Sequence, residues 1–383
     1  MAARWHGNNG SRRRKEGSIN KSFARTRAAL ASGIEHGLHP GAQLYVSQRG
    51  EILIDEAFGE ARPGVPMQRD SIMLWFSAGK PLTAVAIGQL IESGAMVWQT
   101  RVAEVIPEFA QNGKGAVTVW HLLTHTAGLR NADGGSAADA EAKLAWICGL
   151  PLEEDWVPGQ RAGYHVKGSW QLLGEIVRRL SGKPVEQFLR EATFPRLGMR
   201  ATALAFAGRE IADLGTRLAF VFDTSGGALE PKEGWNNLDG FTRCRPGGSA
   251  RGPVCELGRF YEAMLDGGES VLRPETAKLM TSRQRVGMFD ETFKFKMDWG
   301  LGFIINSNRD GFQMPYSFGR HAFRETFGHS GNQVSCGFAD PLHRLVVAWA
   351  CNGMPGERNH QQRQRLINNA IYEDLGLAEN SGV

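Results

Sequence analysis

The chain has 383 residues, 42% of them hydrophobic, so it can bury one large core or two smaller ones. Lys and Arg number 44 against 40 Asp and Glu, and the net charge of +4 gives no general attraction to nucleic acid. The sequence contains no run of about 18 uncharged apolar residues, and no apolar segment follows its basic N-terminal region. We therefore expect a two-lobed cytoplasmic protein with neither a membrane span nor a secretory signal.

Residues 1–20 are rich in Gly, Asn, Ser and Arg and are expected to form a mobile tail. The cysteines are odd in number, widely spaced and without a Cys-x-x-Cys pair, which is typical of free thiols in a reducing compartment. Because each lies among apolar or small residues, we interpret them as buried small side chains and not as catalytic thiols. They are Cys148, Cys244, Cys255, Cys336 and Cys351.

The N-terminal part predicts a helix followed by a β-hairpin. Apolar residues recur at helical spacing over residues 22–36, and Gly37 closes that segment. Residues 42–47 and 51–58 are β-rich runs separated by three polar or small residues, so a sheet begins here.

The middle part, from about residue 77 to 214, predicts helices only. They are expected at residues 81–92, 119–125, 137–148 and 169–180. A Gly/Pro-rich stretch at residues 246–253 separates this part from the C-terminal part.

The C-terminal part predicts a return to strands. A helix at residues 256–265 precedes strand-like runs at 301–306, 334–338 and 344–351, and a helix at 362–375 ends the pattern. This order is expected of one α/β domain interrupted by a helical insertion. We place the α/β domain at residues 21–75 and 240–383 and the helical domain at 76–239.

The strongest local motif is Ser77-Ala-Gly-Lys80 at the start of an apolar helix. The i, i+3 spacing puts both side chains on one helical face. A serine hydroxyl needs an adjacent base, and a lysine amine can be that base once burial favours its neutral form. The tetrapeptide alone also fits a helix-starting serine beside a solvated lysine. Ser18 and Lys21 have the same spacing in the polar leader, and we interpret that pair as a chance match.

Two further segments could complete a site. Tyr164 could pass a proton to a leaving group, although a lone tyrosine is more often a packing residue. The segment His329-Ser330-Gly331-Asn332 leads into a predicted strand, where small residues allow close approach of a substrate and an edge amide can bind an oxyanion. His329 alone would be an ordinary, partly buried histidine.

In their order and separation these segments resemble the serine active-site family of DD-peptidases, class C β-lactamases and β-lactamase-like esterases and transesterases. That family has Ser-x-x-Lys, then Tyr-x-Asn or a variant, then Lys/His-Thr/Ser-Gly. Flanking segments match as well, at residues 122–129, 195–199 and 299–303. The resemblance covers roughly residues 22–375. It implies an α/β fold in which an antiparallel sheet is flanked by N- and C-terminal helices and an all-helical domain is inserted.

The resemblance also implies roles for individual residues. Ser77 would be the acylated nucleophile, Lys80 its base and Tyr164 the proton relay. The oxyanion hole would use the backbone amides of Ser77 and Asn332, and the segment from His329 through Ser330 and Gly331 would help bind the substrate.

One departure from the family pattern bears on the substrate. Val166 stands where peptidases and β-lactamases have an asparagine that contacts the lysine and the substrate amide. Its apolar side chain should also help keep the Lys80 amine neutral. We therefore expect a small ester or thioester as the acyl donor, for hydrolysis or transfer. The loop at residues 247–253 also departs from the family pattern.

Other interpretations stay open. The chain could be an amide hydrolase of the DD-peptidase or β-lactamase type, or a non-catalytic binding protein in the same fold. Residues 328–332 half-resemble a nucleophile elbow, but Asn332 replaces its last glycine. His121 and His125 are four apart, but Leu122 replaces the glutamate of a zinc peptidase, so a structural role is favoured. We expect no cofactor, metal, nucleic-acid or membrane partner, and the sequence leaves the oligomeric state open.

Overall fold

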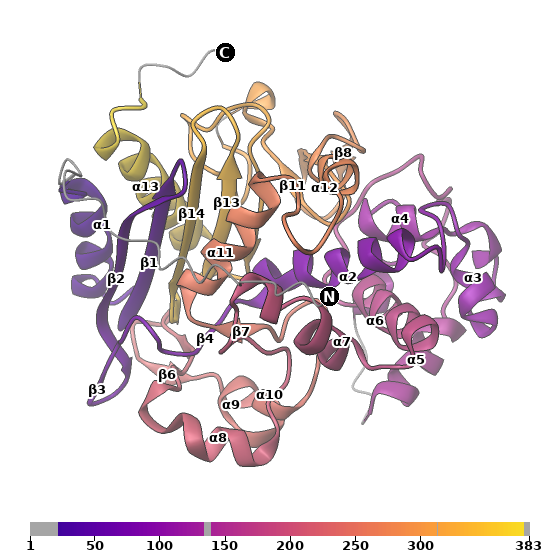
Figure 1. Cartoon of the computed structure of the whole chain (residues 1–383), viewed down its shortest axis with the longest axis horizontal. Helices are drawn as coiled ribbons and strands as arrows, with labels where there is room; N and C mark the ends of the chain where they lie inside the picture. The colour runs from indigo at the N-terminus through magenta and orange to yellow at the C-terminus, as the bar shows by residue number, and fades with distance from the viewer. Residues whose placement is uncertain (1–21, 134–138, 312, 379–383) are drawn as a thin grey trace, which may run out of the picture.

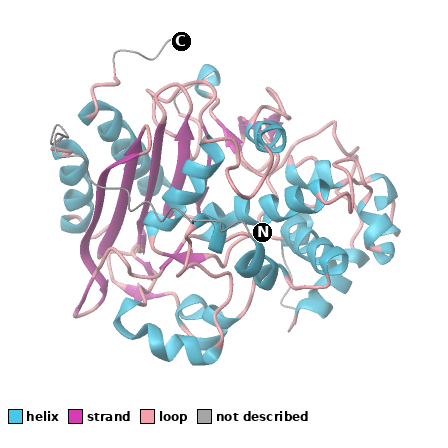
Figure 2. Cartoon of the chain, viewed as in Figure 1, coloured by secondary structure: helices cyan, strands magenta, loops and turns pink. Residues whose placement is uncertain are grey.

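The computed structural model describes residues 22–133, 139–311 and 313–378, so the expected tail at residues 1–20 lies outside the described residues. Its largest sheet has eight strands in the order β10-β11-β12-β13-β14-β1-β2-β3, and every neighbouring pair is antiparallel. Figure 2 shows these strands gathered in one half of the molecule. Their bounds are β1 Gly41–Gln48, β2 Glu51–Arg62, β3 Val65–Pro66, β10 Asp298–Trp299, β11 Ile304–Ile305, β12 Phe327–Gly331, β13 Ser335–Asp340 and β14 Leu345–Cys351.

Helices from both ends of the chain pack against this sheet (Figure 1). Helix α1 (Ala24–Glu35) lies beside α13 (Glu357–Asp374), and the Thr26 hydroxyl donates to the Asp374 carboxylate at 2.8 Å. Helix α11 (Val254–Leu265) packs against β1, β13 and β14. The predicted fold class, an antiparallel sheet flanked by N- and C-terminal helices, is confirmed.

The period of two along β1 explains how the sheet buries both faces. Leu44 and Val46 share a core with α1 and α13, whereas Tyr45 points to the other face, where it contacts Gly258 of α11. The turn after β1 consists of Arg49 and Gly50, and both have positive φ angles, 54° and 79°. Two such residues match the twist of a tight hairpin.

The middle part folds into helices around α2, as the sequence predicts. Helix α2 is apolar on nearly all sides and lies between the sheet and the other helices (Figure 1), which explains why its sequence lacks a polar face. The predicted helix at 137–148 is α5, although residues 137 and 138 lie outside the described ones. The helices are α2 Lys80–Glu92, α3 Val102–Val105, α4 Val119–Leu123, α5 Ala140–Gly149, α6 Gly168–Ser181 and α7 Val185–Ala192.

A further group of short elements follows the helical part. Its residues form a small core of their own, which includes Phe206, Leu218 and Phe241, and β5 pairs with β15 and β6 in a separate three-stranded sheet. The domain boundaries at residues 75/76 and 239/240 stay a prediction. The remaining elements are α8 Gly208–Leu214, α9 Glu233–Asn236, α10 Leu238–Thr242, α12 Pro274–Thr281, β4 Met73–Leu74, β5 Phe222–Asp223, β6 Glu230–Pro231, β7 Arg251–Gly252, β8 Phe289–Asp290, β9 Phe295–Lys296 and β15 Gly353–Met354.

One predicted strand is shorter than the sequence suggests. Of residues 301–306, only Ile304 and Ile305 form a strand. Gly302 has a φ of 83°, its amide bonds to Leu123, and a Cβ there would lie 2.5 Å from Ala84. Close packing against α2 therefore bends the chain where the apolar run predicts an extended strand.

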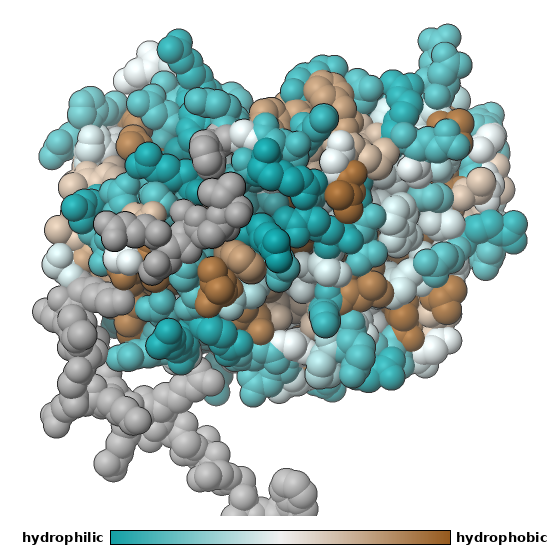
Figure 3. All heavy atoms as spheres, turned by 90° about the horizontal axis from the view of Figure 1, so that it is seen from above, coloured by the Kyte–Doolittle hydropathy of each residue, from teal (hydrophilic) through white to brown (hydrophobic). Residues whose placement is uncertain are grey.

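The surface carries both hydrophilic and hydrophobic residues. In Figure 3 hydrophilic residues cover most of the visible face, and hydrophobic residues occur in small groups. Among the described residues, no helix is both long and apolar enough to cross a membrane. The five cysteines are free, and three of them are buried.

The packing of α13 on the sheet can be tested with two adjacent residues. Ile367 is fully buried, whereas Leu366 is 57% exposed. We expect Ile367→Ala to lower the free energy of unfolding by about 2–5 kcal/mol, because it leaves a cavity in the core. Leu366→Ala is the matched control and should change it little. Urea unfolding followed by circular dichroism measures both, and equal effects would contradict this packing.

Candidate active site

Ser77 lies in a 3-10 turn, Phe76–Gly79, that runs directly into α2. It is partly exposed, although the residues around it in sequence are buried. Phe76 has a φ of 47°, in the left-handed region that a bulky residue rarely adopts. This turn presents the Ser77 hydroxyl at the surface of a cavity.

The Lys80 side chain is fully buried beside that hydroxyl. Its Nζ lies 3.0 Å from Ser77 Oγ and donates to the backbone carbonyls of Val166 at 2.9 Å and Gly247 at 2.6 Å. A neutral amine has two N–H groups and one lone pair. If the two carbonyls accept the N–H groups, the lone pair is left for the proton of Ser77, which is the geometry of a serine and its base.

Gly247 is close to the lysine for a steric reason. A Cβ at this position would lie 2.7 Å from the Trp170 ring and 3.0 Å from Lys80 Nζ. The glycine therefore lets its own carbonyl reach the amine. The sequence singled out this loop only as a departure from the family pattern, and its contact with Lys80 was not predicted.

Val166 contacts Lys80 differently from the way the sequence suggests. The residue is 40% exposed and lines the cavity, while its backbone carbonyl accepts a bond from Lys80. The sequence led us to expect the apolar side chain of Val166 beside the Lys80 amine. The structure shows that the polar backbone carbonyl of Val166 contacts the amine instead.

Tyr164 lies in an irregular segment and lines the same cavity as Ser77. Its ring stacks on Trp299 with 5.6 Å between centroids and contacts Phe293 and His125 at 4.9 and 4.6 Å. Lys80 Nζ is 5.4 Å from the centre of the Tyr164 ring. The structure therefore brings Ser77, Lys80 and Tyr164 together at one cavity.

Strand β12 carries the residues of the third predicted segment. The Ser330 hydroxyl accepts a bond from Gln364 of α13, so this side chain points away from His329. A Cβ on Gly331 would lie 2.0 Å from the carbonyl oxygen of Trp75, which brings the end of β12 against the turn that holds Ser77. Asn332 follows, exposed and lining the cavity. Asn332 and Ser77 thus line the same cavity, and the oxyanion role of their backbone amides stays a prediction.

His329 is buried and neutral. Burial, and next the charge of Lys80, lowers its pKa from 6.5 to about 3. Its Nδ1 lies 2.8 Å from the Ser330 carbonyl, which only an N–H can bond, so Nε2 carries the lone pair. His329 therefore carries no positive charge, and its Nε2 is a buried acceptor without a hydrogen-bond partner among the described residues.

The cavity has a volume of about 770 Å³. Its lining includes Ser77, Tyr164, Val166, Gly247, His329 and Asn332. Basic side chains from other segments line it too, namely Lys143, Lys167, Arg243 and Arg245. The arrangement brings a serine hydroxyl, a buried lysine amine and a tyrosine together at one cavity large enough for a small-molecule ligand.

Two competing interpretations find little support in the geometry. Ser330 lies within a strand and bonds to Gln364, which differs from the exposed strand-to-helix turn of a nucleophile elbow. His121 accepts the Thr118 amide at the start of α4, and His125 is buried against Tyr164. Within the described residues, no group of three or more potential ligands could hold a metal ion.

Similarity to known proteins agrees with this geometry. The sequence model of the Beta-lactamase family matches residues 27–371. The chain belongs to the Beta-lactamase family. Penicillin-binding protein 4 of Amycolatopsis lactamdurans is 30% identical to this family member over 336 residues, 82% of this chain and 81% of that protein. Esterase/beta-lactamase LipL of Mycobacterium tuberculosis is 28% identical over 375 residues, 89% of this chain and 83% of that protein.

Solved structures give the same result for the fold. The structure of a family VIII carboxylesterase is 26% identical, with a TM-score of 0.75, and the match covers 92% of this chain and 97% of that one. A penicillin-binding protein homologue from Caulobacter crescentus is 27% identical, with a TM-score of 0.74, over 92% of this chain and 97% of that one. The resemblance seen in the sequence is confirmed. This Beta-lactamase family member is similar to hydrolases that include esterases.

The partly exposed Ser77 beside Lys80 generates a first prediction for this site. A fluorophosphonate probe should label Ser77 alone, because it pairs an accessible hydroxyl with a buried base. Lys80→Ala should slow labelling by at least about a hundredfold, since the base is lost. Peptide mapping by mass spectrometry locates the label, with Ser77→Ala as the control. A label on Ser330 would refute the assignment.

The buried histidines generate a second prediction. Burial lowers the pKa of both His165 and His329 from 6.5 to about 3. Between these values the unfolded chain binds protons that the folded chain does not, so the free energy of unfolding is highest above pH 6.5 and falls as the pH decreases. Urea unfolding from about pH 7 to about pH 5 measures this slope. His329→Gln should flatten it, and an unchanged slope would contradict this account.

Proposed function

We propose that this protein is a serine hydrolase or acyltransferase that acts through a Ser77 acyl-enzyme on a small ester or thioester. The observation that carries the proposal is the Lys80 amine, buried and within 3.0 Å of the Ser77 hydroxyl. In its neutral form this amine can donate its two N–H groups to the carbonyls of Val166 and Gly247 and keep its lone pair for the Ser77 proton. The pair would supply the activated nucleophile that acyl transfer requires.

In the proposed acylation, Lys80 takes the Ser77 proton while Oγ bonds to the acyl carbon. The backbone amides of Ser77 and Asn332 bind the oxyanion that forms on the carbonyl oxygen. When the bond to the leaving oxygen or sulfur breaks, the proton returns from Lys80 to that atom through the Tyr164 hydroxyl. Water, or the hydroxyl of another acceptor, then attacks the acyl-enzyme, and the reverse proton path frees Ser77.

Two features of the cavity favour an ester over an amide donor. Val166 presents an exposed aliphatic side chain, which cannot orient an amide by hydrogen bonds. The neutral His329 supplies no positive charge for a carboxylate next to the scissile bond. An alkoxide or thiolate leaves more readily than an amide nitrogen, so the remaining groups can suffice.

A second candidate is an amide hydrolase of the DD-peptidase or β-lactamase type. The similarity to Penicillin-binding protein 4 favours it, and so do the basic side chains of the cavity wall, which could bind a substrate carboxylate. A comparison of three substrates distinguishes these two candidates from each other and from a non-catalytic binding protein.

To test the proposed function, kcat/KM is measured for a short acyl ester, a cephalosporin and a D-alanyl peptide, and the three values are compared. We expect the ester to be preferred by at least about a hundredfold, because the site lacks a group that orients an amide. Val166→Asn should narrow this preference, and Leu366→Ala is a surface control that should not change it. Equal efficiency on the ester and on the lactam or peptide would favour the amide hydrolase. No acyl adduct with any of them would favour a binding protein.

A further inference from the structure

One short segment holds the backbone of Tyr164 from both sides. The carboxylate of Asp290 accepts the Tyr164 N–H at 3.1 Å, and the Thr292 hydroxyl donates to the Tyr164 carbonyl at 3.0 Å. Tyr164 belongs to no helix or strand. These two side chains, the rings around Tyr164 and the bonds of the Gly163 and His165 amides to His125 help fix its place in the cavity.

Asp290 is fully buried and has several partners. Its Oδ1 accepts the backbone N–H groups of Tyr164, Thr292 and Phe293, and its Oδ2 accepts from the Arg285 guanidinium at 2.9 Å. A buried carboxylate persists only with such compensation. Asp290 thus fixes the hairpin of β8 and β9 and Tyr164 with one side chain.

Arg285 extends this support to the other side of Tyr164. It is fully buried and donates to the Thr124 carbonyl at 3.0 Å, directly before His125. Its backbone pairs with Trp299, and its guanidinium lies 5.2 Å from the centre of the Trp299 ring, which stacks on Tyr164. Burial lowers the pKa of Arg285 to about 10, so it stays charged at neutral pH.

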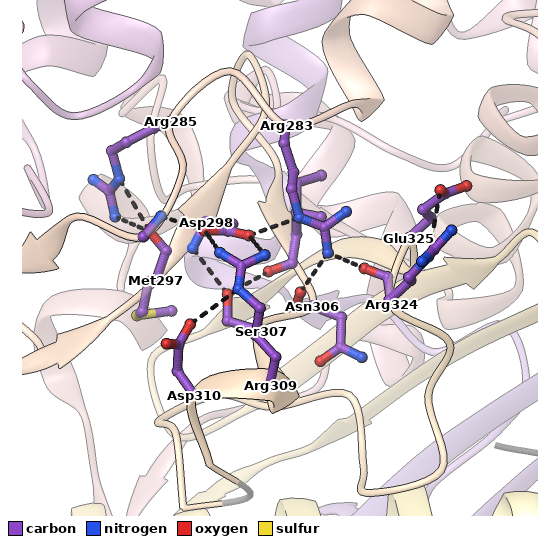
Figure 4. A network of polar contacts seen from close by, with 12 residues as sticks. Arg283, Arg285, Met297, Asp298, Asn306, Ser307, Arg309, Asp310, Arg324 and Glu325 are labelled. Carbon is purple, nitrogen blue, oxygen red and sulfur yellow. Dashed lines mark hydrogen bonds and ion pairs between the residues drawn. The ribbon is translucent and has the colours of Figure 1, made fainter. Parts of the chain in front are cut away.

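A second buried aspartate lies nearby but has different partners. Figure 4 shows Arg285 reaching the Met297 carbonyl, whereas Arg283, two residues earlier, reaches Asp298. Asp298 also accepts from Arg309 and from the amide of Gly287. Of the two aspartates, only Asp290 bonds to Tyr164.

We propose that Asp290, paired with Arg285, is a positioning residue that holds Tyr164 where its hydroxyl can relay the proton. The inference rests on the proposed role of Tyr164. A relay hydroxyl must lie within hydrogen-bond reach of both the base and the leaving atom, and a misplacement of about 1 Å can cost about a hundredfold in rate. The Asp290–Arg285 pair sets this position through the backbone of Tyr164 and the ring beneath it.

The test is a double-mutant cycle of Asp290→Asn and Tyr164→Phe. The acylation rate is measured from the burst of 4-nitrophenol released by 4-nitrophenyl acetate, at a temperature where circular dichroism shows each variant folded. Asp290→Asn should slow acylation at least about tenfold with little change in KM, because the hydroxyl is displaced while the cavity remains. In the Tyr164→Phe background the same change should alter the rate by less than about twofold, since no hydroxyl is left to position.

Two further variants complete the design. Thr292→Val removes the bond to the Tyr164 carbonyl. It should slow acylation less than Asp290→Asn does, and this loss should also vanish in the Tyr164→Phe background. The variant keeps the inference testable if Asp290→Asn fails to fold. Asp340→Asn is the matched control. Asp340 is also fully buried and accepts a backbone N–H, that of Phe323, together with the hydroxyl of Tyr372. Asp340→Asn should lower the free energy of unfolding. It should not change the acylation rate, with either Tyr164 or Phe at position 164.

The possible results separate this inference from the proposed function. Slow acylation in Tyr164→Phe, together with losses from Asp290→Asn and Thr292→Val that vanish in that background, supports the positioning role. Slow acylation in Tyr164→Phe with equal losses in both backgrounds, or with none, overturns the positioning role and leaves the relay intact. Normal acylation in Tyr164→Phe overturns the relay, and the positioning role with it.

Discussion

The arrangement of this site depends on a lysine amine that is buried beside a serine hydroxyl. An amine out of reach of water must find its hydrogen-bond partners inside the protein. Besides Ser77, its partners include Val166, from the segment before α6, and Gly247, from the loop that precedes α11. Because the carbonyls of Val166 and Gly247 both bond to this amine, two segments that are far apart in the sequence lie together around Lys80. The cavity forms where these parts meet.

Local patterns in the amino-acid sequence predict many of the helices and strands and the pair at the centre of the site, whereas the full architecture was predicted from the resemblance to a known family. Apolar spacing predicts α2, and the i, i+3 separation then places Ser77 and Lys80 on one face without further knowledge of the fold. The hairpin of β1 and β2 follows from two β-rich runs around Arg49 and Gly50. These features are local, so a single segment of sequence determines each of them.

The partners of that pair could not be predicted from the sequence, because they are backbone groups or distant side chains. The Val166 carbonyl that binds Lys80 would be present with any residue at that position, so residue identity carries no signal for it. Gly247 differs, because only a glycine fits between Trp170 and the amine. Asp290 and Arg285 lie more than a hundred positions after Tyr164, and their contact depends on the completed fold. The period of two along β12 could have indicated that His329 and Ser330 point to opposite sides, but the neutral state of His329 follows only from its burial.

The contact between α1 and α13 has a practical consequence for handling the molecule. Thr26 in the first turn of α1 bonds to Asp374 in the last turn of α13, so the first and last helices meet at their outer ends. The cavity is lined instead by the turn that holds Ser77, the segment around Tyr164 and the loop at Gly247. Neither Thr26 nor Asp374 is among the residues that line the cavity. The same closeness of the ends lets a short linker join them, so that the chain can be reopened at the two-residue turn of Arg49 and Gly50 as a circular permutant.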